Sequence, residues 1–168
     1  MHRTYDRFVR PHIMTEEANL QFRLARREDV PAIVRLLADD TLGAQRESAA
    51  EPLPEVYSSA FEAVEASPDN EIIVGESGGA VVACLQITYI PGLGRKGVLR
   101  AQIEAVRVAS SMRGVGLGER LMREAIDRAR QRGCGLVQLT SDKERSDAHR
   151  FYERLGFAAT HDGMKLEL

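Results

Sequence analysis

The most informative segment for chemistry is a glycine-rich run just before an amphipathic helix. It reads Arg113, Gly114, Val115, Gly116, Leu117 and Gly118. Glycine has no Cβ atom, so its backbone can approach a ligand closely. The first turn of a helix leaves N–H groups without intrahelical partners, and the helix dipole favours negative charge there. The run therefore predicts an anion site, to which Arg113 adds a permanent charge and a planar set of donors.

Two common nucleotide motifs do not fit this run. The Walker pattern G-x-x-x-x-G-K-[ST] is absent, and in the dinucleotide pattern G-x-G-x-x-G the last glycine would fall on Glu119 or Leu121. The strand after the helix also lacks an acidic residue at the distance where it would bind a ribose. Nucleoside triphosphates and NAD are poorly supported. On the glycines alone, a helix start without any ligand stays an equal alternative.

The elements that position the run follow from the apolar pattern. Alternation predicts strands, and a period near 3.6 predicts helices. Strands are expected at 20–24, 71–76, 80–90, 98–108, 136–140, 157–161 and 164–168, and helices from 27, over 55–66, from about 116 to 131 and over 146–155. This order indicates an α/β or α+β domain with a mixed sheet. The unit from 98 to 140 is expected to be a right-handed parallel crossover.

Composition limits the classes of function. The chain has 168 residues, 43% of them hydrophobic and 29% charged, and a formal net charge of −2. These values fit one globular domain, and together with an aromatic content of 5% they argue against a nucleic-acid module. No apolar run or leader suggests a membrane span or secretion, so we expect a cytoplasmic protein. Residues 1–19 are interpreted as an arm and 20–168 as a single domain.

The two cysteines, Cys84 and Cys134, form no C-x-x-C pair. They are expected to be plain thiols. The histidines His149 and His161 titrate near neutral pH, but they lack a spacing typical of metal sites. We therefore expect no metal, and His149 is interpreted as a partly exposed residue of the last helix.

Two further segments, Val106-Arg107-Val108 and Ala148 to Phe157, lie before and after Arg113, Gly116 and Gly118. Together the three segments resemble the GCN5-related N-acetyltransferase (GNAT) superfamily. Its [QR]-x-x-G-x-[GA] signature falls on Arg113, Gly116 and Gly118. Val106-Arg107-Val108 is similar to the strand whose backbone pairs with the pantetheine arm, and Ala148 to Phe157 is similar to the A-x-x-[FL]-Y-x-x-x-G-F segment. The segment Arg23-Leu24-Ala25, near the start of the pattern, also resembles this family. The resemblance covers roughly residues 20–168, and its last third is most like small-molecule amine acetyltransferases.

The resemblance implies a GNAT fold, a mixed sheet of about six to seven strands flanked by about four helices. It implies acetyl-CoA as cosubstrate, with its pyrophosphate at the glycine run, and a primary amine, of a small molecule, as acceptor. Cofactor-binding residues are then Val106, Arg107, Val108, Arg113, Gly114, Val115, Gly116, Leu117, Gly118, Ser141, Arg145, Phe151 and Tyr152. Arg145 departs from the family pattern, which often has Asn there. A homodimer follows by analogy. Protein or peptide acetylation and a non-catalytic acyl-CoA sensor are the alternatives.

Acetyl transfer requires a proton donor for the thiolate and an acceptor for the amine proton. Tyr152 is the candidate acid, because a phenol is protonated at neutral pH. Glu104 is the candidate base: it lies in an apolar strand, where burial raises the pKa of a carboxyl group, and its parity matches Val106 and Val108. The alternative is that a path of water molecules takes the proton from the amine.

The acceptor is expected to be chosen by two loops and the second helix, which border the acceptor site in this family. The loops are Asp39–Pro54 and Pro91–Gly97. The second loop carries a small basic cluster, Arg95, Lys96 and Arg100, that could contact an acidic substrate or a cofactor phosphate. Ser141 and Asp142, just after the fifth strand, are placed within reach of cofactor or substrate.

Overall fold

Five strands form one sheet in the computed structural model, which describes residues 19–40 and 43–168. The strands are β1 (Gln21–Leu24), β2 (Asn70–Ser77), β3 (Ala80–Ile90), β4 (Arg100–Val108) and β5 (Leu136–Leu139). They lie in chain order across the sheet. The first three pairs are antiparallel, which confirms the predicted hairpin of β2 and β3, and β4 pairs with β5 in parallel. The predicted mixed sheet is thus confirmed.

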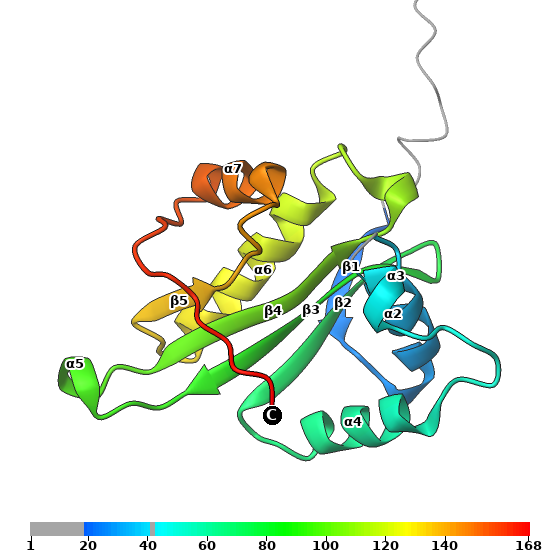
Figure 1. The fold of residues 1–168 in the computed structure, drawn as a ribbon, viewed down its shortest axis with the longest axis horizontal. Helices are drawn as coiled ribbons and strands as arrows, with labels where there is room; N and C mark the ends of the chain where they lie inside the picture. The colour runs from blue at the N-terminus through cyan, green and yellow to red at the C-terminus, as the bar shows by residue number, and fades with distance from the viewer. Residues whose placement is uncertain (1–18, 41–42) are drawn as a thin grey trace, which may run out of the picture.

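Helices cover both faces of this sheet (Figure 1). Those of more than one turn are α2 (Val30–Leu37), α4 (Glu55–Glu65), α6 (Leu117–Gln131) and α7 (Ser146–Arg154). Single turns are η1 (Arg27–Asp29), α3 (Gly43–Arg46), α5 (Gly94–Gly97) and η2 (Ser110–Met112). Helix α6 packs on β3 and β4 from one side, whereas α2 and α4 pack on the other side. The four helices expected from the sequence are those longer ones.

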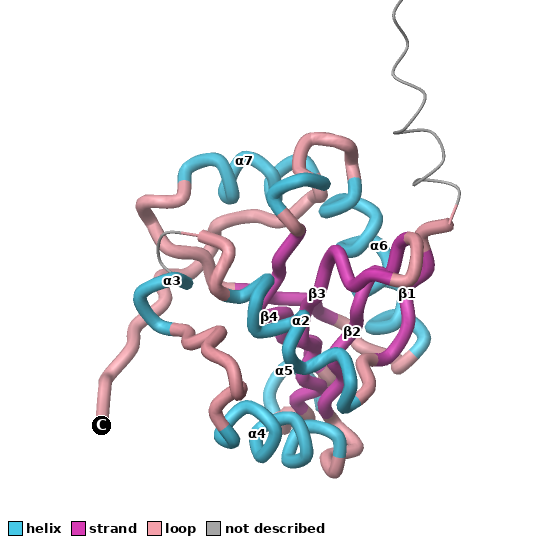
Figure 2. The backbone as a smooth tube through the Cα atoms, turned by 90° about the vertical axis from the view of Figure 1, so that its right-hand side faces the viewer, coloured by secondary structure: helices cyan, strands magenta, loops and turns pink. Residues whose placement is uncertain are grey.

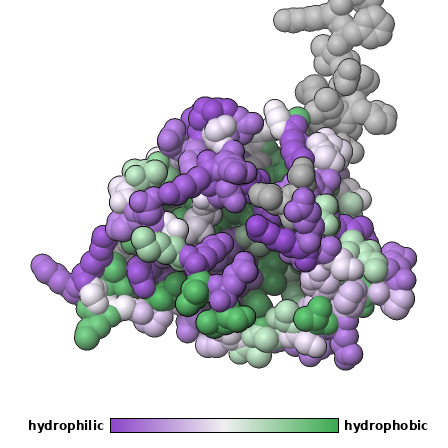
Figure 3. All heavy atoms as spheres, viewed as in Figure 1, coloured by the Kyte–Doolittle hydropathy of each residue, from purple (hydrophilic) through white to green (hydrophobic). Residues whose placement is uncertain are grey.

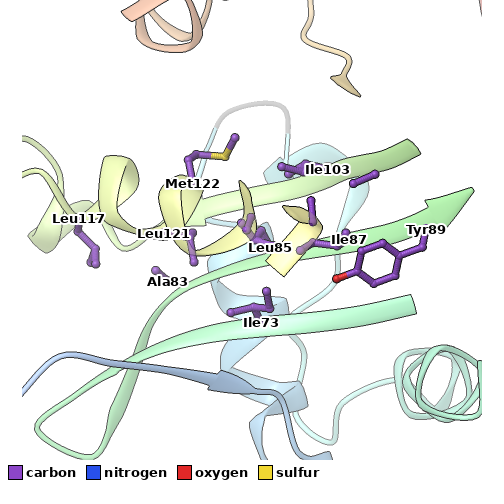
Figure 4. Packing of buried hydrophobic residues seen from close by; sticks show 12 residues of the cluster. Ile73, Ala83, Leu85, Ile87, Tyr89, Ile103, Leu117, Leu121 and Met122 are labelled. Atoms are coloured by element: carbon purple, nitrogen blue, oxygen red, sulfur yellow. The ribbon is translucent and has the colours of Figure 1, made fainter. Parts of the chain in front are cut away.

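The main core lies between α6 and the sheet (Figure 4). Leu121 and Met122 of α6 are fully buried there against Leu85, Ile87 and Ile103. The apolar face that the sequence indicates for α6 is the face that it buries. On the other side of the sheet, α2 buries Ile33 and Leu36 against Val74 and Cys84 in a second cluster.

Strand β4 is paired on both sides for only half of its length. Its pairing with β5 runs from Arg100 to Ile103, whereas its pairing with β3 continues to Val108. From Glu104 onward, the edge of β4 that faced β5 therefore has no strand beside it. The two parallel strands separate like a fork.

A bulge lies at the point where this fork opens. Ala105 has a φ of 54°, a left-handed conformation that is uncommon for a residue with a side chain. The register with β3 shifts there: Glu104 lies opposite Gln86, whereas Arg107 lies opposite Cys84. An extra residue in one strand reverses the alternation of side chains beyond it.

The predicted strands at 157–161 and 164–168 are wrong. No strand forms after α7, so the sheet has five strands instead of six to seven. The last residues run in front of the sheet and end away from it (Figures 1 and 2). Met164 is 94% and Leu166 86% exposed. Alternation in the sequence sets the two faces of a strand, but a strand also needs a neighbouring strand to bond with its backbone. None of the strands that the structure describes pairs with this segment.

The arm predicted at residues 1–19 lies almost wholly outside the described residues. The interpretation of 20–168 as a single domain stays a prediction. Within the part of the chain that the structure describes, every helix is too short or too polar to span a bilayer.

Candidate active site

The glycine run is the link between β4 and α6, at the end where the fork opens. Gly114 has a φ of 80° and Gly116 a φ of 82°. A side chain on either would meet no atom within 4 Å, so the space beside this loop is open. Gly116 is the residue before α6 and provides no side-chain cap. The first N–H groups of α6 therefore have no capping side chain, and the anion site expected there stays a prediction.

Arg113 holds this loop in place. Its Nε donates to the carbonyl oxygen of Val108 at 3.1 Å, and its Nη2 donates to the carboxylate of Asp39 at 2.9 Å. Asp39 also accepts the N–H of Ser110 at 2.9 Å. The side chain of Arg113 thus joins the end of α2 to the loop, and its charge is already paired. Its role as a phosphate ligand stays a prediction.

The free edge of β4 presents backbone groups toward the gap. Ala109 donates its N–H to Val82 on β3 at 2.8 Å. Successive peptide groups of a strand point to opposite sides, so the N–H of Val108 points away from β3. The carbonyl of Val106 accepts a hydrogen bond from Arg107 Nη1 at 3.0 Å. The N–H of Val108 can therefore donate to an extended ligand between β4 and β5, whereas the carbonyl groups of Val106 and Val108 already accept from Arg107 and Arg113.

Helix α7 places two aromatic rings beside this gap. The ring of Phe151 lies 3.5 Å from the position that a Cβ of Gly118 would occupy, and Val108 lies 3.7 Å from the same point. Phe151 contacts Tyr152 edge to face, with their centroids 5.1 Å apart. The start of α6, the end of β4 and α7 thus converge, as the three motifs of the sequence imply.

Tyr152 is half-buried within this convergence. Burial raises the pKa of its hydroxyl above the usual value, and the charges of Arg145 and Arg107 oppose that rise. The phenol is therefore protonated at neutral pH and can donate a proton. Both cysteine thiols also have a raised pKa through burial, and that of Cys84 reaches about 12. Neither thiol is a thiolate nucleophile at neutral pH.

The sequence did not reveal the part that Asp40 takes in this site. Its Oδ1 accepts the N–H of Gly43 at 2.6 Å, and its Oδ2 lies 3.7 Å from Arg107 Nε and 3.8 Å from Arg145 Nη2. Burial acts to raise the pKa of Asp40, but the bond from Gly43 and the nearby arginines lower it overall. No motif connects Asp40 with residues far along the chain, so only the fold brings these charges together.

The arguments for Glu104 as a base were wrong in two respects. Its side chain is exposed, so it lacks the burial that was expected. The bulge at Ala105 also removes the shared parity: Val106 and Val108 pack toward the α6 core, whereas Glu104 lies beside Gln86. The role of Glu104 as base stays a prediction, and it now depends only on whether the carboxylate can reach the acceptor amine.

The basic loop lies at the opposite end of the sheet. Arg95 and Lys96 belong to α5, at the lower left tip in Figure 1, whereas the link between β4 and α6 lies near the top. Arg100 and Val108 are the two ends of β4, eight positions apart, which is roughly 26 Å at about 3.3 Å per residue. The structure does not bring this cluster to the glycine run.

The remaining predicted residues lie on the link between β5 and α7. Ser141 is half-buried, and Asp142 is exposed. The carbonyl of Asp142 lies 2.9 Å from His149 Nε2, so His149 holds this link. His161 contacts the hydroxyl of Thr160 in the exposed tail. Among the residues described here, no group of three or more potential ligands is placed to hold a metal.

A separate hollow of about 890 Å³ lies beside η1, α2 and the turn between β2 and β3. Arg23, Asp29, Arg35 and Ser110 are among the residues that line it, and it contains none of the predicted site residues. The convergence of β4, α6 and α7 is therefore the candidate site on chemical grounds. Hydrophilic residues cover the surface near α7 (Figure 3).

Comparison with known proteins agrees with this fold. The sequence pattern of the Acetyltransferase (GNAT) family matches residues 31–157. This range exceeds half of the chain, and the chain belongs to that family. The members of this family use acetyl-CoA as the acetyl donor.

Curated relatives match shorter parts of the chain. An aminoalkylphosphonate N-acetyltransferase of Salmonella typhimurium is 40% identical over 60 residues, which are 36% of this chain and 39% of the relative. A glucosamine 6-phosphate N-acetyltransferase of Trypanosoma brucei brucei is 36% identical over 90 residues, 54% and 59% of the two chains. The N-alpha-acetyltransferase RimI of Mycobacterium tuberculosis is 32% identical over 99 residues, 59% of each. The chain thus spans at most about three fifths of these relatives.

A solved structure from Bacillus halodurans covers far more. That protein, described as a transcriptional regulator, is 46% identical and superposes with a TM-score of 0.87. The match covers 89% of this chain and 100% of the other. The architecture described above is therefore shared over nearly the whole chain.

Proposed function

We propose that this protein is an N-acetyltransferase that moves the acetyl group of acetyl-CoA to a primary amine of a small molecule. The observation that carries the proposal is the convergence of an open strand edge, an uncapped helix start and a protonated tyrosine at one point. Two relatives are named for small amines, which supports a small acceptor.

The residues present fit the donor. Gly114 and Gly116 leave open space beside the first turn of α6, where the pyrophosphate would be bound. Val106 and Val108 offer the backbone edge along which the pantetheine arm would lie, and Phe151 bounds that gap. Ser141 would add a further contact from the link after β5.

The chemistry is a direct transfer in a ternary complex. The neutral amine nitrogen attacks the carbonyl carbon of the thioester, a C–N bond forms and the C–S bond breaks. The N–H of Val108 stabilises the negative charge that develops on the carbonyl oxygen. Tyr152 donates its proton to the departing thiolate, and water or Glu104 accepts the amine proton. An acyl-enzyme is disfavoured, because both thiols are protonated at neutral pH.

A thiol-release assay with acetyl-CoA and a panel of small amines tests the proposal. We expect free thiol only when both are present, and the acetamide by mass spectrometry. A second panel of peptides with free N-termini tests the alternative of peptide acetylation, which the RimI relative favours.

A non-catalytic acyl-CoA sensor is the remaining alternative, and the solved relative described as a transcriptional regulator favours it. Calorimetric binding of acetyl-CoA without thiol release across both panels would support the sensor and contradict the enzyme.

A further inference from the structure

Two arginine side chains beside Tyr152 have donor groups that no described residue accepts. Arg107 Nη1 donates to Val106, but Arg107 Nε is buried without a hydrogen-bond partner. Within the described chain, the guanidinium of Arg145 has a single contact with an acid, the 3.8 Å approach to Asp40, which is longer than a hydrogen bond. Buried guanidinium donors normally find an acceptor.

The charges around these two arginines do not balance. Asp39 is already paired with Arg113, so among the acids that the structure describes only Asp40 lies between Arg107 and Arg145. One Asp40 oxygen accepts the N–H of Gly43, and the other lies beyond hydrogen-bond distance of both guanidinium groups. Two positive groups thus share one carboxylate, and one positive charge is left over. An oxyanion with several acceptor atoms would suit these donors, because guanidinium groups bind such anions through paired hydrogen bonds.

The position of Arg107 indicates which reactant carries this anion. The side chains of Val106 and Val108 point toward α6, where the phosphates of the donor are expected. Arg107 lies opposite Cys84, and the side chain of Cys84 belongs to the cluster under α2. The side chain of Arg107 therefore lies on the face of β4 that is turned toward α2 and away from α6. The pantetheine arm carries no charge. An anion at Arg107 and Arg145 is therefore on the acceptor side.

We propose that Arg107 and Arg145 bind an oxyanion group of the acceptor, a phosphonate, phosphate or carboxylate, while the amine of the same molecule reaches the thioester beside Tyr152. This inference rests on the proposed function and specifies its substrate class: a short amine with an anionic group a few bonds from the nitrogen. In the free protein, Asp40 partly neutralises the arginines and competes with that group.

Steady-state kinetics with 3-aminopropylphosphonate and 3-aminopropanol tests the proposal, since these amines differ in the anionic group. We expect kcat/KM to be at least about tenfold higher for the phosphonate. In Arg107→Gln and Arg145→Gln, kcat/KM for the phosphonate falls about tenfold or more and the ratio between the two amines approaches one. Asp40→Asn lowers KM for the phosphonate. Arg130→Gln, an exposed arginine on α6, is the matched control and keeps the ratio.

Two binding measurements complete the test. Titration of 3-aminopropylphosphonate into the protein saturated with coenzyme A reports the subsite without turnover, and titration of acetyl-CoA reports the donor site. Equal kcat/KM for both amines in the wild type, or glutamine variants that lose acetyl-CoA affinity while keeping the preference, would overturn the proposal. If binding of the phosphonate needs both arginines but no amine is acetylated, the subsite is supported and only the proposed enzymatic activity is refuted.

Discussion

Tyr152 is the residue on which the chemical step depends most directly. Its ring contacts that of Phe151, and burial raises the pKa of its hydroxyl while the charges of Arg145 and Arg107 oppose that rise. We predict that Tyr152→Phe lowers kcat by about a hundredfold, the lower range for loss of a general acid. The dissociation constant of acetyl-CoA should stay within about twofold, because the ring and its packing remain. Wild-type turnover in this variant would remove the role.

A variant of Glu104 tests which group accepts the proton of the amine. Because the side chain of Glu104 is exposed to water, we expect Glu104→Gln to keep the pH–rate profile of the wild type. The proton would then leave through water. Glu153→Gln, an exposed carboxylate on α7, is the control. A profile altered by Glu104→Gln alone would assign the base to Glu104.

At the scale of elements, the turn before α6 offers a matched pair of glycines. Gly116 precedes α6 and Gly133 follows it; both have a φ of 82°, and a side chain on either would meet nothing within 4 Å. Alanine at each position should therefore cost the same backbone strain, about 1 kcal/mol. We predict that Gly116→Ala also weakens acetyl-CoA binding at least tenfold, whereas Gly133→Ala does not.

Thermal unfolding and calorimetry of the two glycine variants check this prediction. Equal losses of the melting temperature with unequal losses of affinity are expected. If both variants keep the wild-type affinity, the ligand does not approach the backbone at Gly116.

The elements differ in how well the sequence predicts them. Helix α6 and strand β3 were predicted almost to the residue, because long periodic apolar patterns have one favourable way to be buried. The bulge at Ala105 was not foreseen, since one extra residue in a strand leaves the apolar pattern nearly unchanged. The last twelve residues alternate between apolar and polar like strands, but no strand of the described residues pairs with them. Asp40 was missed because its partners Arg107 and Arg145 come from distant elements.

For the whole molecule, a buried charge pair joins β1, β2 and the start of α2. Asp29 is 6% exposed and accepts hydrogen bonds from Arg23 at 2.7 and 3.0 Å and from the N–H of Arg26 at 2.7 Å. Arg23 also donates to Glu76 on β2 at 2.8 Å. We predict that Asp29→Asn lowers the free energy of unfolding by about 2 kcal/mol at pH 7.

The same pair predicts a dependence of stability on pH. The hydrogen bonds from Arg23 lower the pKa of Asp29 below its ordinary value of 3.8. The stabilisation is therefore fully present above that value and is lost as the pH falls through the lowered pKa of the folded state. The gap in melting temperature between wild type and Asp29→Asn should shrink below about pH 4. Asp127→Asn, in an exposed pair on α6, should show no gap at any pH. A gap that widens in acid would contradict the assignment.

The fork between β4 and β5 has a consequence for handling the protein. From Glu104 to Val108 the sheet has an interior edge that no strand covers. Uncovered edges are where one chain templates another and where aggregation begins. On the proposed function, the pantetheine arm lies along this edge and shields it, so coenzyme A acts as a substitute for a missing strand. Preparations saturated with coenzyme A should then stay monodisperse longer on storage than ligand-free ones, quite apart from any catalytic turnover.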